Sequence, residues 1–207
     1  MTRDDEVVPI HQSRIELRPR RQGSFEISLV VALATAAVAA SAWAAPGLRG
    51  MLGAGLAVLM LAIAITDARD FIIPDALTAG AFALALFNAG MDDNATVLEG
   101  VAEAVLRGLA LAVVFLMVRA IYRRIRGRQA IGLGDVKLAA VAGAWLDWMM
   151  IPVAIEIAAF AALAVYGLRH LTGDQPIRLK QKVPFGLFFA PAIWVCWFVE
   201  GALLAPL

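Results

Sequence analysis

Two aspartates, Asp67 and Asp135, stand where long apolar stretches of the chain meet polar ones. Asp67 closes an apolar run in AITDARDFIIPDALT, and Asp135 opens another in GLGDVKL. Two carboxyl groups held together in a low dielectric share one proton, because like charges a few ångströms apart cannot both ionise cheaply. The ionised member can take a proton from water while the protonated member hydrogen-bonds a carbonyl oxygen. The pair therefore indicates acid–base hydrolysis without a metal or a cofactor.

Glycines surround the second aspartate. Gly132 and Gly134 precede Asp135 closely, and glycine adopts backbone φ values that are closed to other residues. We expect these two glycines to use that freedom and to let a substrate strand approach the backbone. An acidic residue is also favoured in the first turn of a helix by the helix dipole, which places Asp135 at a helix start.

The composition indicates a membrane protein. Apolar residues make up 61% of the 207-residue chain, well above the roughly 45–50% of soluble domains. The net charge of +1 gives no reason to expect a nucleic-acid partner. The single cysteine, Cys196, excludes an internal disulfide and is expected to be a buried thiol. The two histidines, His11 and His170, are too far apart in sequence to suggest a metal site.

Apolar runs predict an all-α, polytopic bundle of about seven transmembrane helices, with six as the fallback. The run that begins at Phe25 has the length of a full span rather than of a signal peptide. We therefore expect a basic, disordered cytoplasmic tail over 1–24 and a transmembrane domain over 25–207. The predicted helices are 25–45, 51–66, 76–91, 102–120, 136–147, 149–168 and 186–204.

The basic residues predict the orientation. With the N-terminus in the cytoplasm, all of the 18 Lys and Arg residues except Arg49 and Arg107 fall on the cytoplasmic side, which is the positive-inside pattern. Lys137 and Arg169 then share one side, so an even number of crossings separates them. This count favours seven helices and places Asp67 and Asp135 at the same cytoplasmic depth.

Three short motifs, taken together, resemble a known family. GLGDVKL matches the GxGD motif of the type IV prepilin peptidases, which are membrane aspartyl proteases. Asp67 lies seven residues before Pro74 of an Ile-Pro pair, as the first catalytic aspartate of that family does. KVPFG, at 182–186, is similar to a further signature before the last helix. The resemblance covers about residues 50–205.

The resemblance implies an integral-membrane aspartic endopeptidase that acts in pilus biogenesis or type II secretion. It would remove the short basic leader from prepilins or pseudopilins at the cytoplasmic face of the bacterial inner membrane, with the substrate's apolar stem in the bilayer among the lipids. It implies no cofactor and a peptidase-only form, because the cysteine-containing N-terminal region of larger members does not fit in 1–24. Asp67 and Asp135 would be catalytic, and the residues that shape the site would be Pro74, Gly132, Gly134, Lys137, Pro184, Phe185 and Gly186.

Several alternatives stay open at this level. Asp67 and Asp135 could be ordinary caps where helices leave the membrane, and Asp70 and Asp75 are read as caps or solvated residues. A small proton- or cation-coupled transporter or channel would place its carboxylates near the middle of the bilayer. An inactive pilus-assembly scaffold is the third reading. Glu156 lies inside a predicted span, where an ionisable residue is a functional candidate by default.

Overall fold

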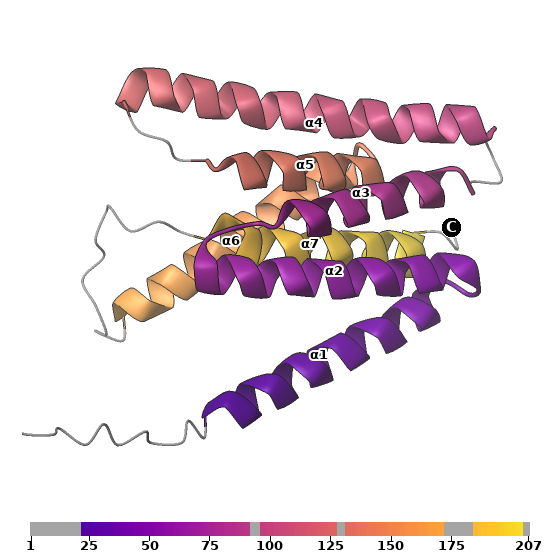
Figure 1. The fold of residues 1–207 in the computed structure, drawn as a ribbon, viewed down its shortest axis with the longest axis horizontal. Helices are drawn as coiled ribbons and strands as arrows, with labels where there is room; N and C mark the ends of the chain where they lie inside the picture. Colours follow the sequence, from indigo (N-terminus) through magenta and orange to yellow (C-terminus); the bar gives the residue numbers. More distant parts are fainter. Residues whose placement is uncertain (1–21, 92–95, 128–130, 172–183, 205–207) are drawn as a thin grey trace, which may run out of the picture.

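The computed structural model describes residues 22–91, 96–127, 131–171 and 184–204, and Figure 1 shows a bundle of helices. The described residues form seven α-helices and one π-helical turn, in the order α1 (Gln22–Ala44), α2 (Leu48–Asp70), α3 (Asp75–Ala89), α4 (Val97–Arg126), α5 (Leu133–Trp145), α6 (Met150–Leu171), α7 (Phe185–Val199) and η1 (Glu200–Leu204).

Five of the helices in the described ranges, namely α1, α2, α4, α6 and the α7–η1 segment, are long and apolar enough to cross a membrane. α3 is a shorter apolar helix of 15 residues, and α5 has only 13. The predicted fold class, a polytopic all-α bundle, is confirmed. The number of crossings, the orientation and the division at residue 24 stay predictions, and residues 1–21 lie outside the described ranges.

Helix α4 is longer than its apolar run. Thr96 caps its start by accepting the backbone N–H of Glu99, while the Glu99 side chain accepts the N–H of Thr96. Gly127, with a φ of 65°, ends it. Its 30 residues span about 45 Å, against about 30 Å of hydrocarbon. The predicted bounds of 102–120 were therefore too narrow, because the capped first turn and the arginines of the last turns are also helical.

The corner between α2 and α3 carries a residue of the site. α2 ends where Phe71 adopts a left-handed conformation, with a φ of 55°, and donates its N–H to the carbonyl of Asp67 at 3.0 Å. Pro74 caps the start of α3, and a proline disfavours the helical region for the residue before it. The chain therefore stays extended at Ile73, whose side chain is buried.

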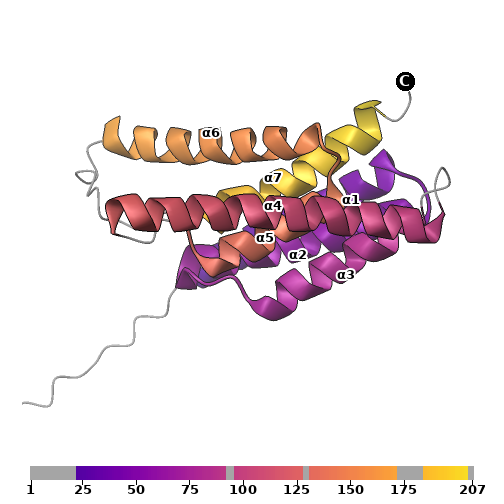
Figure 2. The same cartoon turned by 90° about the horizontal axis from the view of Figure 1, so that it is seen from above.

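The core lies between α2, α5 and α7. α2 packs against α1, α3 and α7, and α5 packs against α3, α4 and α7. In Figure 2, α6 and α3 lie along opposite edges of the bundle, and α4 passes in front of α5. Gly53 of α2 faces the indole ring of Trp197, so the two helices approach closely. Cys196 is buried, as expected of a packing thiol. The largest buried core side chains of these three helices include Leu56, Met60, Ile63, Leu138, Val141, Phe189 and Ile193.

Candidate active site

Three segments that are far apart in sequence meet at one end of the bundle. The corner between α2 and α3, the start of α5 and the start of α7 all lie at the end where α4 finishes (Figure 1). These segments carry the three motifs singled out in the sequence. The structure therefore brings the motifs together through helix packing, since α2 contacts α7 and α3 contacts α5.

Asp67 lies in the last turn of α2 and points at the first turn of α7. Its side chain is buried, with a relative exposure of 5%, and its Oδ2 accepts the backbone N–H of Leu187 at 2.9 Å. The first N–H groups of a helix have no partner within the helix and carry a partial positive charge, so a carboxylate is stabilised there. The contact requires glycine at position 186, because a Cβ there would lie 2.9 Å from the same Oδ2.

Asp135 lies in the first turn of α5, where its partial exposure contrasts with the burial of Asp67. Its Oδ2 accepts the backbone N–H of Gly132 at 2.9 Å. This is one half of a capping box, because Gly132 has no side chain to return a hydrogen bond. The start of α5 that carries Asp135 lies at the same end of the bundle as the end of α2 that carries Asp67.

Ile73 fills the space between the two aspartate-bearing segments. A Cβ added at Gly134 would lie 2.9 Å from the Cβ of Ile73, and one added at Gly186 would lie 2.9 Å from its Cδ1. The corner between α2 and α3 thus rests against two glycines, one at the start of α5 and one at the start of α7. Sequence reasoning noted Ile73 only as the residue before Pro74.

The expected use of Gly132 and Gly134 is wrong in one respect. Gly132 has a φ of −72°, and the positive-φ glycines of the described residues are Gly47 and Gly127. Gly134 is required for space rather than for backbone conformation, because its missing side chain leaves room for Ile73. The approach of a substrate strand to these glycines stays a prediction.

Lys137 lies near the aspartates but pairs with another residue. Its Nζ contacts Oδ1 of Asp75 at 2.5 Å, with both side chains well exposed. An exposed ion pair contributes only about 0–1 kcal/mol, so its effect is to tie the start of α5 to the start of α3. Asp70 is exposed at the end of α2.

Pro184 and Phe185 fix the start of α7. Pro184 is the residue that precedes the helix, and the ring of Phe185 packs against Phe115 of α4, at 6.2 Å, and against Phe189, at 5.0 Å. Phe185 therefore anchors α7 to α4. Lys182, the first residue of the KVPFG motif, lies outside the described residues.

The arrangement can perform acid–base chemistry with two carboxyl groups. Each aspartate uses one oxygen for a backbone N–H. Within the described ranges, no group of three or more His, Cys, Asp and Glu side chains is placed to hold a metal ion. The fold and this end of the bundle define a polytopic helical membrane protein with an acidic pair held near the ends of its helices.

Comparison with known proteins identifies the family. The family model described as the type IV leader peptidase family matches residues 54–168, more than half of the chain and a range that includes both aspartates. The chain belongs to the type IV leader peptidase family. The PFG segment at 184–186 lies beyond the matched residues.

Individual relatives agree with this assignment. The chain is 34% identical over 164 residues to a prepilin leader peptidase/N-methyltransferase of Burkholderia pseudomallei (strain 1026b), an alignment that covers 78% of this chain and 51% of the relative. A protein of the same name from Dickeya chrysanthemi is 35% identical over 160 residues, which is 76% of this chain and 51% of the relative. The chain thus spans about half the length of these curated relatives. No solved structure gives a significant match.

Proposed function

We propose that this protein is an integral-membrane aspartic endopeptidase that removes the leader from type IV prepilins or pseudopilins, with Asp67 and Asp135 as its catalytic pair. The observation that carries the proposal is that the two segments bearing the acids meet at Ile73, at one end of the bundle. The names of the relatives supply the substrate class.

The proposed chemistry is hydrolysis by a pair of acids that holds one proton. The ionised carboxylate takes a proton from water, and the resulting hydroxide attacks the carbonyl carbon of the scissile peptide bond. The protonated carboxyl group donates a hydrogen bond to the carbonyl oxygen as it becomes negative. The C–N bond then breaks, and the leaving amine receives a proton from the pair. The backbone donors of Gly132 and Leu187 support this role because they hold the two carboxyl groups in place.

The membrane location of the substrate follows from the same proposal. The site lies at the end of the bundle that carries Arg69, the arginines of α4's last turn and Lys137, which supports a cytoplasmic position by the positive-inside rule. A prepilin would present its leader to this end while its apolar stem stays in the inner membrane beside the helices. Neither aspartate lies at the middle of its helix, so the transporter alternative gains no support from them.

The test is co-expression with a candidate prepilin and detection of leader removal on a gel. Asp67→Asn and Asp135→Asn should each abolish cleavage, because each removes one of the two groups that exchange protons. Asn keeps the size of the side chain, and an amide oxygen can still accept the backbone N–H, so insertion and folding should be retained.

Asp70→Asn and Asp75→Asn are the matched controls, because both lie in the same stretch of sequence and both are exposed. Each should retain most of the activity. Cleavage by Asp67→Asn, or loss of cleavage in Asp70→Asn alone, would show that the first catalytic residue has been assigned wrongly.

A further inference from the structure

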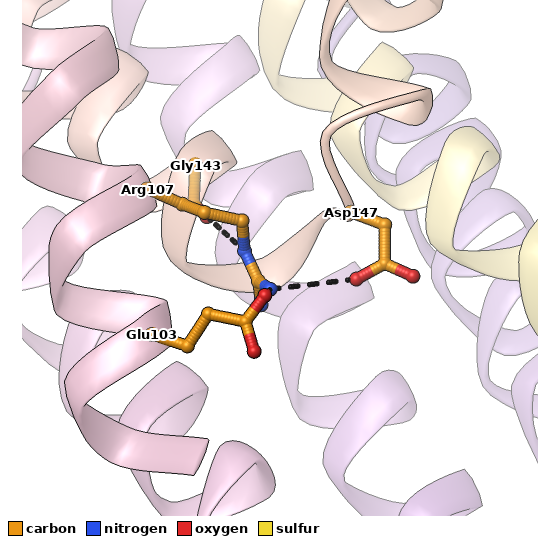
Figure 3. Close-up of polar contacts among 4 residues, drawn as sticks. All are labelled: Glu103, Arg107, Gly143 and Asp147. Carbon is orange, nitrogen blue, oxygen red and sulfur yellow. Dashed lines mark hydrogen bonds and ion pairs between the residues drawn. The ribbon is translucent and has the colours of Figure 1, made fainter. Parts of the chain in front are cut away.

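A second group of charged residues lies within the bundle, away from the aspartate pair (Figure 3). Its centre is Arg107 of α4, which is buried with a relative exposure of 9%. Its NH1 contacts Oε1 of Glu103, one turn earlier on the same helix, at 2.7 Å, and Oδ1 of Asp147, in the turn between α5 and α6, at 3.5 Å. The proposed chemistry of the site uses none of these residues.

Arg107 also binds the backbone of α5. Its Nε donates a hydrogen bond to the carbonyl of Gly143, in the last turn of that helix, at 3.3 Å. Carbonyls at the end of a helix lack partners within the helix and carry a partial negative charge, which a cation stabilises. Arg107 therefore holds both the last turn of α5 and the turn that follows it.

The short length of α5 gives a reason for a cation such as Arg107 at the end of this helix. The 13 residues of α5 span about 20 Å, which is short of the about 30 Å hydrocarbon core. In Figure 1, α5 ends well short of the end of the bundle at which α4 begins. The turn that carries Asp147 follows this short helix and lies among helices that are long and apolar enough to cross a membrane. Within a membrane, backbone and charge are tolerated only with partners in the protein or in water.

The backbones of α4 and α5 are in close contact at the same place. A Cβ added at Gly143 would lie 2.5 Å from the carbonyl oxygen of Arg107, and one added at Gly108 would lie 2.8 Å from that of Ala140. Two facing glycines let helices approach closely in a membrane. The contact leaves α5 little room to slide along α4 without losing the Arg107 hydrogen bond.

Asp135 lies at the opposite end of this short helix. A helix transmits a shift of one end to the other, because its backbone hydrogen bonds resist stretching. We propose that Arg107 is a positioning residue: by binding the end of α5 and its turn, it fixes the height and rotation of that helix and so the place of the Asp135 carboxyl group. This inference rests on the proposed peptidase function.

The test compares substitutions that remove the contacts of Arg107 with α5 and its turn with one substitution that keeps them. Arg107→Met keeps an unbranched apolar stem about as long as the aliphatic part of arginine, but it removes the hydrogen bond to Gly143 and the contact with Asp147. We expect the kcat for prepilin cleavage to fall at least tenfold with KM within about threefold, since a misplacement of about 1 Å can cost up to about a hundredfold in rate. Arg107→Lys should recover part of the rate, because it keeps the charge but loses the planar fork.

Glu103→Gln is the matched control. Glu103 touches the same guanidinium group but lies on α4 itself, so it does not bridge the helices, and glutamine still accepts a hydrogen bond. This variant should cleave at nearly the wild-type rate. Asp147→Ala should cleave at a rate between those of Glu103→Gln and Arg107→Met, because the hydrogen bond from Arg107 to Gly143 remains. If Arg107→Met does not fold, Asp147→Ala provides the test.

The outcomes separate the two proposals. Failure of the wild-type protein to cleave any prepilin would contradict the proposed function, and with it this inference. Wild-type protein that cleaves, together with unchanged kcat in folded Arg107→Met or in Asp147→Ala, would overturn the positioning role alone. The same conclusion follows if Glu103→Gln loses as much activity as Arg107→Met, or if every loss is matched by a loss of folded protein.

Discussion

Gly186 leaves space that two other residues occupy. The Asp67 carboxyl group and the end of the Ile73 side chain both lie where its Cβ would be. Residue types and spacing sufficed to single out Asp67 and Asp135 as candidates, and their catalytic role stays a prediction. The backbone N–H that donates to Asp67 could not be predicted, because it belongs to Leu187, which lies 120 residues away along the chain. Only helix packing brings the two residues together.

Gly186→Ala should impair both packing and catalysis. The added Cβ would lie 2.9 Å from the Asp67 carboxylate and 2.9 Å from Ile73 Cδ1, and overpacking of this kind costs about 1–3 kcal/mol. We expect a lower unfolding temperature in detergent and at least a tenfold lower cleavage rate. Gly80→Ala is the control, since nothing lies within 4 Å of its Cβ position, and it should leave both quantities unchanged or slightly raise stability.

The two contacts of that Cβ can be separated by a second substitution. Ile73→Val removes Cδ1 and should return part of the stability that Gly186→Ala loses. It leaves the clash with Asp67, so the cleavage rate of the double variant should stay low. Recovery of rate and stability together would show that Gly186 serves packing against Ile73 and does not serve Asp67.

The acidic pair should give a bell-shaped pH profile. Under the proposed mechanism the working form carries one proton on two carboxyl groups, so activity should fall at low pH, when the base is protonated, and at high pH, when the shared proton is lost. Both limbs belong to the pair and neither belongs to one aspartate. Single-turnover cleavage with enzyme in excess, measured over a wide pH range, is the appropriate experiment. A flat profile with chemistry limiting would exclude proton sharing.

Helix α5 is held from several sides, which makes this short element a firm support for Asp135. Its first turn rests on Ile73 and its last turn on α4, while the indole of Trp145 donates its N–H to the carbonyl of Ala81 in α3 at 2.9 Å. The sequence predicted this helix at 136–147, and the structure has it at Leu133–Trp145. The start was missed because glycines open it, although the acid in its first turn is itself a start signal.

Trp145→Phe should loosen this support. The change removes a buried hydrogen bond and part of a ring that also meets Trp197 edge-on, and we expect a loss of about 1–3 kcal/mol in the free energy of unfolding. Thermal unfolding in detergent gives the measurement. Trp148→Phe, at an exposed ring nearby, should unfold at the wild-type temperature, and equal losses in the two variants would argue against a specific role for the Ala81 contact.

The molecule as a whole is asymmetric along the length of the bundle. Most of the described basic residues, with the exception of Arg49 and Arg107, lie toward the end where α2 and α4 finish and α5 begins, whereas α4 starts with a capped acidic turn. Hydropathy and charge sufficed to predict an all-α bundle, because apolar runs and basic clusters are local features of the sequence. The contacts between helices depend on shape, and pairs such as Gly53 with Trp197 or Gly108 with Ala140 have no signature in a single sequence.

The ends of α4 provide a direct test of orientation. Single cysteines at Leu98 and Ile125, two exposed positions near its ends, should label from opposite sides of the membrane in a Cys196→Ser background. Ile125→Cys should react with a membrane-impermeant reagent only after the cytoplasmic side is opened. Labelling of both from the same side would contradict a spanning α4 and a cytoplasmic site.

The hydrogen bond from Leu187 to Asp67 also has a consequence for the order of events during synthesis. A ribosome delivers the chain from its N-terminus, so both aspartates enter the membrane before α7 exists. Until residue 187 has emerged, the Asp67 carboxyl group lacks the helix end that holds it. A nascent chain therefore carries both acids in an unfinished arrangement, and under the proposed function cleavage should begin only after α7 has been inserted.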